Sequence, residues 1–272
     1  MLQPVCTGAS AGTFVVGLAS EIFLKVRIDK LLVDRGLAAS RERAQALVLA
    51  GNVLVDEQKI EKAGAQVSEH CVIRLLGEDL KYVSRGGLKL ERALDHWNIE
   101  VMGKVCLDVG ASTGGFTDCL LQRGARQVIA VDTGYGQMDF KIRQDARVQL
   151  LEKTNARYLT RDALGVAVDF IAMDVSFISA TLVLPAVIAA AFPESPDERR
   201  GRQLVALVKP QFEAGREHVG KGGIVRDEAA QLAAVEKVKA AAAGLGALHI
   251  DTIDSPILGA EGNREFLLYS VF

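Results

Sequence analysis

The chain has 272 residues, of which 49% are hydrophobic and 24% are charged, and its formal net charge is −2. These values exclude an intrinsically disordered protein, and the length suffices for one large domain and one small domain. A nearly neutral chain has no overall attraction for nucleic acid, so any basic surface must be local.

The composition also argues against a membrane protein and a metalloprotein. No stretch reaches the ~18 apolar residues of a membrane-spanning helix. The four cysteines lie far apart and form no C-x-x-C pair, which predicts free thiols in a reducing compartment and no zinc site. We therefore expect a cytoplasmic protein without a metal and without membrane segments.

Residues 1–24 precede the first regular pattern. The first twenty residues carry no charge, so the basic start of a signal peptide is missing, and polar residues interrupt the apolar run. We interpret this segment as a disordered tail, or as the result of a translation start placed too far upstream.

A small α+β domain is predicted over residues 25–80. Apolar residues recur at helical spacing over 27–37 and 41–50, and Ser40 is suited to cap the second helix. Short strands over 53–55 and 71–75 complete the module.

Basic side chains gather near the turn between these two helices. Arg35, Arg41 and Arg43 could face phosphates together. Residues 25–59 contain seven basic and five acidic residues, so charge alone favours an ordinary solvated helix surface. The residue order over 28–56 closely resembles the S4 RNA-binding module. That resemblance implies RNA contacts by Lys30 and by the three arginines.

The second domain is predicted over residues 81–272 and begins with a helix within 82–94. Leu88, Leu90 and Leu94 have the spacing to dock on a sheet. Lys89 lies at the start of this helix, where a lysine usually points to solvent.

A nucleotide-binding turn follows. The apolar run 105–109 leads into a Gly/Ser turn and a helix, and a second apolar strand over 127–131 ends at Asp132, which can hold two ribose hydroxyls. Ser112 stands where a dinucleotide-binding turn needs glycine. Asp108 would repel a diphosphate but attract an ammonium or sulfonium group. The turn is similar to the S-adenosylmethionine loop of class I methyltransferases.

Strands and helices alternate over the remainder, as in a doubly wound α/β sheet. We predict strands over 170–178, 203–210, 249–254 and 265–271, helices over 182–192 (with Pro185 in the first turn) and 229–243, and a polar loop over 193–202. Ligands bind outside the carboxyl ends of parallel strands, so the residues that end them should share one rim. These residues are Asp108, Asp132, Asp174 and Lys209.

One phosphate-loop match is rejected. Residues 215–221 fit G-x-x-x-x-G-K, but Gly222 replaces the Ser or Thr that should bind Mg²⁺, and no strand precedes the match.

Five motifs stand in the order of the TlyA family, in which an S4 module precedes an FtsJ-like ribose methyltransferase domain. They occupy residues 84–90, 108–116, 173–179, 208–213 and 262–266, and the resemblance covers the chain from about Val26 onward. It implies a Rossmann-like class I methyltransferase fold, S-adenosylmethionine as cofactor and ribosomal RNA as partner.

The resemblance also implies the site. The catalytic tetrad is Lys89, Asp174, Lys209 and Glu265. Lys209 takes or polarises the proton of a ribose 2′-hydroxyl and Asp174 orients it, while Lys89 and Glu265 position the ribose and tune Lys209. The implied cofactor residues are Asp108, Gly110, Ala111, Ser112, Thr113, Gly114, Gly115, Phe116, Asp132 and Asn155, and Arg85 joins the RNA-binding set.

The implied activity is metal-free methyl transfer to a cytidine 2′-oxygen of ribosomal RNA. Two alternatives stay open. Some family members are called haemolysins, although a pore needs a membrane segment that the sequence does not show. A ribosome binder with a dead methyltransferase domain is the other alternative, against which the intact tetrad argues. The sequence decides neither the ribosomal subunit nor between a monomer and a weak dimer.

Overall fold

The computed structural model describes residues 25–38, 40–76, 81–259 and 262–272. The chain divides into two compact units, with the boundary between Asp79 and Leu80. Segment 1–24, for which the sequence predicts a tail or a misplaced start, lies outside the described residues.

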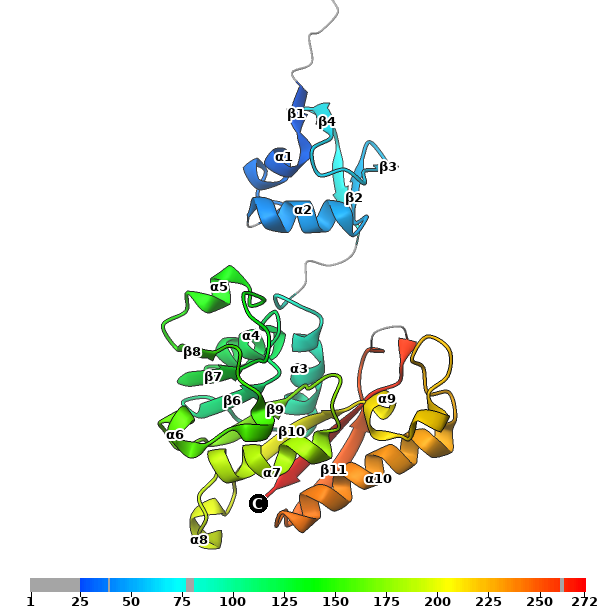
Figure 1. Ribbon diagram of the computed structural model, residues 1–272. Coiled ribbons are helices and arrows are strands. Elements are labelled where there is room, and N and C mark those ends of the chain that lie inside the picture. The colour runs from blue at the N-terminus through cyan, green and yellow to red at the C-terminus, as the bar shows by residue number, and fades with distance from the viewer. Residues whose placement is uncertain (1–24, 39, 77–80, 260–261) are drawn as a thin grey trace, which may run out of the picture. The chain divides into compact units, whose positions relative to one another are not determined.

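The N-terminal unit is a small α+β fold (Figure 1). Its elements are β1 (Lys25–Arg27), α1 (Ile28–Asp34), α2 (Arg41–Leu49), β2 (Val53–Val55), β3 (Gln58–Lys59), β4 (Gln66–Ser68) and β5 (Ile73–Leu75). Strands β1 and β4 form one antiparallel pair, and β3-β2-β5 form a second small sheet. Ser40 caps α2 as predicted, since its Oγ accepts the Arg43 N–H at 3.2 Å. Ile28, Leu32 and Val48 are fully buried in the core between helices and strands.

The C-terminal unit is built on a seven-stranded sheet. In chain order its elements are α3 (Gly86–His96), β6 (Val105–Val109), α4 (Gly115–Gln122), β7 (Gln127–Val131), α5 (Phe140–Arg143), β8 (Val148–Leu151), η1 (Ala156–Tyr158), α6 (Arg161–Leu164), β9 (Phe170–Met173), α7 (Ala180–Ala191), α8 (Pro196–Arg199), β10 (Gln203–Val208), α9 (Pro210–Glu213), η2 (Arg216–His218), α10 (Glu228–Gly244), β11 (His249–Asp254) and β12 (Phe266–Val271). The strand order is β11-β12-β10-β9-β6-β7-β8. Strands β6 to β10 pair in parallel, and only β12 runs antiparallel to its two neighbours. The predicted doubly wound α/β fold is confirmed.

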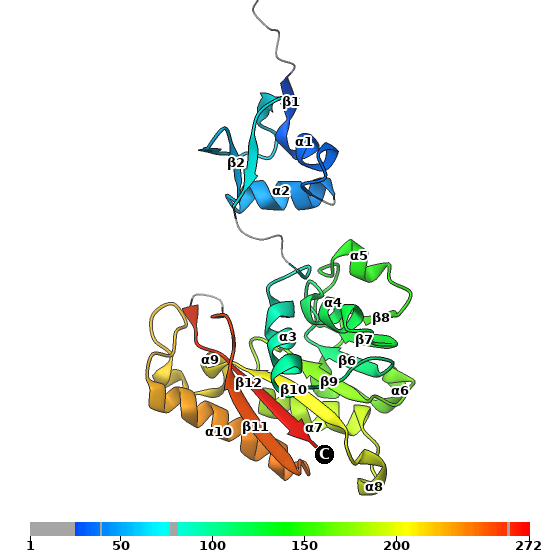
Figure 2. The ribbon, with the colours of Figure 1, turned by 180° about the vertical axis from the view of Figure 1, so that it is seen from behind.

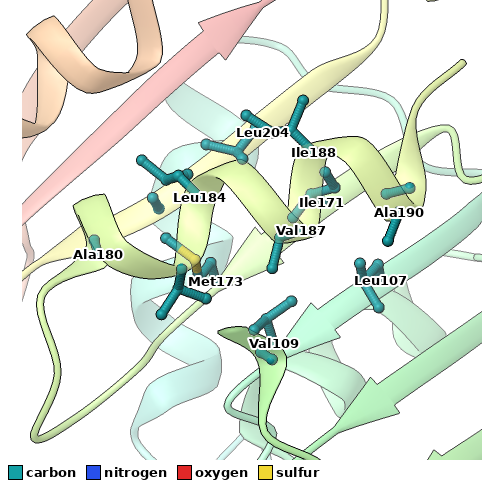
Figure 3. Packing of buried hydrophobic residues seen from close by; sticks show 14 of the residues in the cluster. Leu107, Val109, Ile171, Met173, Ala180, Leu184, Val187, Ile188, Ala190 and Leu204 are labelled. Atoms are coloured by element: carbon teal, nitrogen blue, oxygen red, sulfur yellow. The ribbon is translucent and has the colours of Figure 1, made fainter. Parts of the chain in front are cut away.

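Helices cover both faces of this sheet (Figures 1 and 2). Successive side chains of a strand point to opposite faces. Accordingly Leu107 and Val109 pack with α7 and α10 on one face, whereas Cys106 packs with α3 and α4 on the other. Figure 3 shows Leu107 and Val109 of β6 beneath Val187 of α7. The described cysteines are Cys71, Cys106 and Cys119, which are buried free thiols as expected.

Several predicted boundaries are wrong, among them that of strand β10, which ends at Val208 and not at residue 210 because Pro210 begins α9. Strand β9 ends at Met173, not at residue 178, so Asp174 begins a loop instead of lying within a strand. Helix α7 begins at Ala180, because Ser179 accepts the Thr181 N–H and caps it, so Pro185 falls in the second turn. The predicted loop over 193–202 contains the short helix α8, in which proline occupies the first position.

Candidate active site

The turn between β6 and α4 lies close to the end of β9. A Cβ at Gly110 would lie 2.3 Å from the Asp174 carbonyl oxygen, so only glycine allows this approach. Ser112 has the left-handed φ of 48°, which is rare for a residue with a side chain. Its N–H donates to Asp132 Oδ2 at 2.8 Å, and the Gly134 N–H donates to Oδ1 at 2.6 Å. Asp132 thereby fixes the turn to the end of β7.

Two cavities flank this turn. The first, of about 250 Å³, is lined by Ser84, Arg85, Gly86, Lys89, Gly110, Ala111, Ser112, Thr113, Gly115, Phe116, Asp174, Ile257, Leu258 and Gly259. The second, of about 290 Å³, is lined by Val109, Gly110, Ser112, Val131, Asp132, Thr133, Gln137, Thr154, Asn155, Ala156, Asp174, Val175, Ser176, Phe177, Ile178 and Val183. They share Gly110, Ser112 and Asp174. An elongated ligand could therefore place one end in each cavity.

Most of the predicted cofactor residues line one of these cavities. Gly110, Ala111, Ser112, Thr113, Gly115 and Phe116 line the first, and Asp132 and Asn155 line the second. Gly114 lines neither, and its φ of 94° makes the turn into α4. The strand-end residues do lie at one edge of the sheet, because β6, β7, β9 and β10 are parallel.

Asp108 differs from the sequence-based expectation. Its side chain has no exposed surface and lines neither cavity, so it does not face a ligand in this structure. Thr117 Oγ1 donates to Asp108 Oδ2 at 2.6 Å, which holds α4 against β6. Burial raises the pKa of Asp108 to about 7, and the nearby Asp174 carboxylate adds to the rise.

The four predicted catalytic residues form two ion pairs. Lys209 follows β10, and its Nζ lies 2.6 Å from Asp174 Oδ1 and donates to Ser176 Oγ at 2.7 Å. Lys89 of α3 donates at 2.5 Å to Oε2 of Glu265, the residue that precedes β12. Lys89 and Asp174 line the first cavity. The site therefore presents one cation and one carboxylate to the same space, each backed by a partner of opposite charge.

Two residues at this edge had not been assigned a role from sequence. Ser176 is the hydroxyl partner of Lys209, and only its position two residues after Asp174 could have indicated it. Phe177 is 92% exposed at the second cavity, has a left-handed φ of 63° and packs against Phe212 with the ring centroids 5.4 Å apart. An exposed phenylalanine in that conformation is strained, which marks a functional position more often than a structural one.

The predicted RNA-binding residues differ in their surroundings. Lys30 is exposed on α1, and Arg85 is exposed at the first cavity. Arg35 donates to the carbonyls of Cys71 (2.7 Å) and Glu69, so its guanidinium holds a loop.

Asp29 forms ion pairs with basic side chains of the N-terminal unit. Its side chain is fully buried, and Arg41 Nη2 lies 3.2 Å from its Oδ2. Arg27 and Gln45 also donate to this carboxylate, and these contacts hold its pKa well below the usual range. Arg43 is half-buried on α2.

The described part of the chain contains neither a cluster of metal ligands nor a helix suited to cross a membrane. No group of three or more His, Cys, Asp or Glu side chains there could hold a metal ion. None of its helices combines the length and the apolar character that crossing a membrane requires.

Known proteins resemble both units. The family model of FtsJ-like methyltransferases matches residues 82–272, and that of the S4 domain matches residues 26–73. The 16S/23S rRNA (cytidine-2'-O)-methyltransferase TlyA of Mycobacterium tuberculosis is 44% identical over 246 residues, covering 90% of this chain and 89% of that protein. Hemolysin A of Brachyspira hyodysenteriae is 38% identical over 248 residues, covering 90% of this chain and all of that protein.

A solved structure is similar over nearly the whole chain. This Streptococcus thermophilus protein, which carries a hemolysin name, shares 44% identity at a TM-score of 0.68 and covers 91% of this chain and 88% of its own. Together with the doubly wound sheet and the paired lysines and carboxylates at its edge, these matches show that the chain belongs to the FtsJ-like methyltransferase family and carries an S4 domain ahead of the methyltransferase domain.

Proposed function

We propose that this protein transfers a methyl group from S-adenosylmethionine to the 2′-oxygen of a cytidine ribose in ribosomal RNA. The observation that carries the proposal is the place of Asp174. It lines both cavities, and the Lys209 amine, although Lys209 lines neither, lies 2.6 Å from its Oδ1, so a lysine that can act on a proton is one contact away from the place where two ligands would meet. The names of the relatives supply the substrate class.

The residues present fit S-adenosylmethionine. The second cavity combines the polar Asp132 and Asn155 with apolar Val131, Ile178 and Val183, which suits a nucleoside. Gly110, Ser112 and Asp174 line both cavities, so a ligand in the second cavity could continue into the first. When bound, the cofactor supplies an electrophilic methyl group on a sulfonium centre.

The chain's own residues would orient the acceptor and handle its proton. Asp174, which lines both cavities, and Ser176, which lines the second, hold the Lys209 amine directly behind them. In its neutral form that amine accepts the proton of the 2′-hydroxyl as a general base. Lys89, fixed by Glu265, lines the first cavity, where a hydroxyl or phosphate oxygen of RNA could accept from it.

RNA would be held by both units. The matched S4 domain and the exposed Lys30 support an RNA contact through the N-terminal unit, and Arg85 supports one at the cavity mouth. Ribosomal RNA is a cytoplasmic substrate, so we also propose a cytoplasmic location.

The test is tritiated methyl transfer from S-adenosylmethionine to purified small and large ribosomal subunits and to protein-free rRNA. We expect label on at least one of these substrates. Lys209→Ala should lower the rate by roughly 100-fold or more while cofactor affinity stays within a few-fold. Lys239→Ala is the control, because this lysine pairs with Glu236 on the surface of α10.

Other outcomes assign the protein differently. No label on any RNA, with cofactor binding intact, would favour a non-catalytic RNA binder. Loss of cofactor binding in Lys209→Ala would show that Lys209 supports the fold and does not serve as the base.

A further inference from the structure

Two polar bridges join the loop after β9 to the segment after β10. The first is the contact of Lys209 with Asp174 and Ser176 in the site. The second lies deeper and is made by Glu213, at the end of the one-turn helix α9 that begins directly after Lys209. Glu213 lines neither cavity, and both of its carboxylate oxygens accept hydrogen bonds from the start of α7, so its side chain does not face a ligand.

The second bridge uses every acceptor of the Glu213 side chain. Oε1 accepts the Ala180 N–H at 2.6 Å, and Oε2 accepts the Ser179 hydroxyl at 2.5 Å. Lys237 of α10 lies 3.7 Å from Oε2 and donates to the Glu213 carbonyl at 2.9 Å. The Glu213 side chain is only 2% exposed.

Such burial is unfavourable for a carboxylate, and here it raises the pKa of Glu213 above its ordinary value. A serine already caps α7 through its own hydroxyl, so a buried glutamate is not needed to begin this helix. The position of Glu213 suggests a further role. It ties the turn that carries Lys209 to the segment that continues from Asp174 and Ser176.

We propose that Glu213 is a positioning residue that sets the place of the Lys209 amine relative to Asp174 for methyl transfer. The inference rests on the proposed function of the site. Helix α9 has four residues and no side-chain cap at its start, so little else in its own sequence fixes it. A displacement of about 1 Å at a reacting group can lower a rate by roughly 100-fold. Glu213 therefore acts on the rate constant through Lys209, without contributing to ligand binding.

The experiment compares Glu213→Ala with Glu213→Gln in the full-length protein. We expect the alanine variant to lower kcat by roughly tenfold or more, with the KM for rRNA and the Kd for S-adenosylmethionine within about threefold of wild type. Glutamine should restore kcat to within about threefold. Its amide oxygen can still accept the Ala180 N–H, and its amide nitrogen can donate to Ser179.

Asp169→Ala is the control. This carboxylate also accepts a backbone N–H, from Val105 at 2.9 Å, and pairs with a cation, Arg202, but it is more exposed than Glu213 and lies at the amino ends of β6 and β9, opposite the strand ends that carry the site. Its loss should lower the melting temperature without lowering kcat per cofactor-binding molecule. Ser179→Ala, which removes one bond of the bridge, should lower kcat several-fold and serves if Glu213→Ala does not fold.

Each outcome decides between explanations. If wild type is active and Glu213→Ala has the same kcat as Asp169→Ala, Glu213 only stabilises the fold and the inference is wrong. If Glu213→Ala does not fold, an unchanged kcat in Ser179→Ala leads to the same conclusion. A rise in KM or Kd with kcat unchanged also overturns it. A wild-type protein that methylates no RNA overturns the proposed function, and this inference with it.

Discussion

The Lys89–Glu265 pair should separate stability from activity. Lys89 Nζ lies 2.5 Å from Glu265 Oε2, and the side chains of Lys89 and Glu265 are 10% and 2% exposed, so water screens the two charges little. Removing one partner of such a pair strands the other charge and typically costs about 3–5 kcal/mol, whereas replacing both is often nearly neutral. We therefore expect Lys89→Met alone to lower the free energy of unfolding by about 4 kcal/mol, or roughly 10 °C in melting temperature.

The assay is a double-mutant cycle. Lys89→Met, Glu265→Gln and their combination are unfolded by urea and by heat, and the combination should regain about 2 kcal/mol or more over the sum of the single losses. Lys81→Met is the control, since Lys81 pairs with Glu91 but is 55% exposed and should lose less than about 1 kcal/mol.

Methyl transfer should behave differently in the same proteins. Lys89 lines the first cavity, so the double variant should regain stability but not activity. The reasoning is refuted if the losses of the two single variants simply add, or if Lys89→Met is no more destabilising than Lys81→Met.

Three further predictions concern other charged groups. The pKa of Asp108 is raised from 3.8 to about 7, so the protonated carboxyl stabilises the fold fully below the unfolded-state pKa, and this contribution is lost as the pH rises through 7. Asp108→Asn keeps an acceptor for Thr117, so its free energy of unfolding should gain on that of wild type as the pH rises from about 4 to 7, by at most about 4 kcal/mol. Melting temperatures measured across this range check the gain, and a difference that does not vary with pH would contradict it. In the N-terminal unit, Arg41→Glu with Arg43→Glu should weaken RNA binding and flatten its salt dependence in filter-binding titrations, provided circular dichroism shows a folded unit. Arg35→Ala should instead lower the stability of that unit by about 1–3 kcal/mol, because its guanidinium bonds two backbone carbonyls; unchanged stability would contradict the structural role.

The sheet and the rim of the site could be predicted because they follow from local patterns. Apolar runs that end in Asp132, Asp174 and Lys209 indicate parallel strands, and parallel strands bring their carboxyl ends to one edge. The two ion pairs could not be predicted in this way. Lys89 and Glu265 are 176 residues apart, and a helical lysine by itself points to solvent.

Burial was the other property that local patterns did not show. The sequence places Asp108 at the end of a strand but does not reveal that its side chain is fully buried and bonded by Thr117. Glu213 was overlooked for a related reason. Its partners Ser179 and Ala180 begin another helix, and no spacing along the chain connects them.

The place of β12 in the sheet has a consequence for how this unit folds. It is the last strand in the chain, yet it lies between β10 and β11 and pairs along their whole length. Until it inserts, β10 has an open edge over the apolar run Leu204–Val208. An apolar strand with unpaired N–H and C=O groups is a template for association with another chain. A folding intermediate that lacks β12 therefore exposes this edge, and insertion of this one strand removes it.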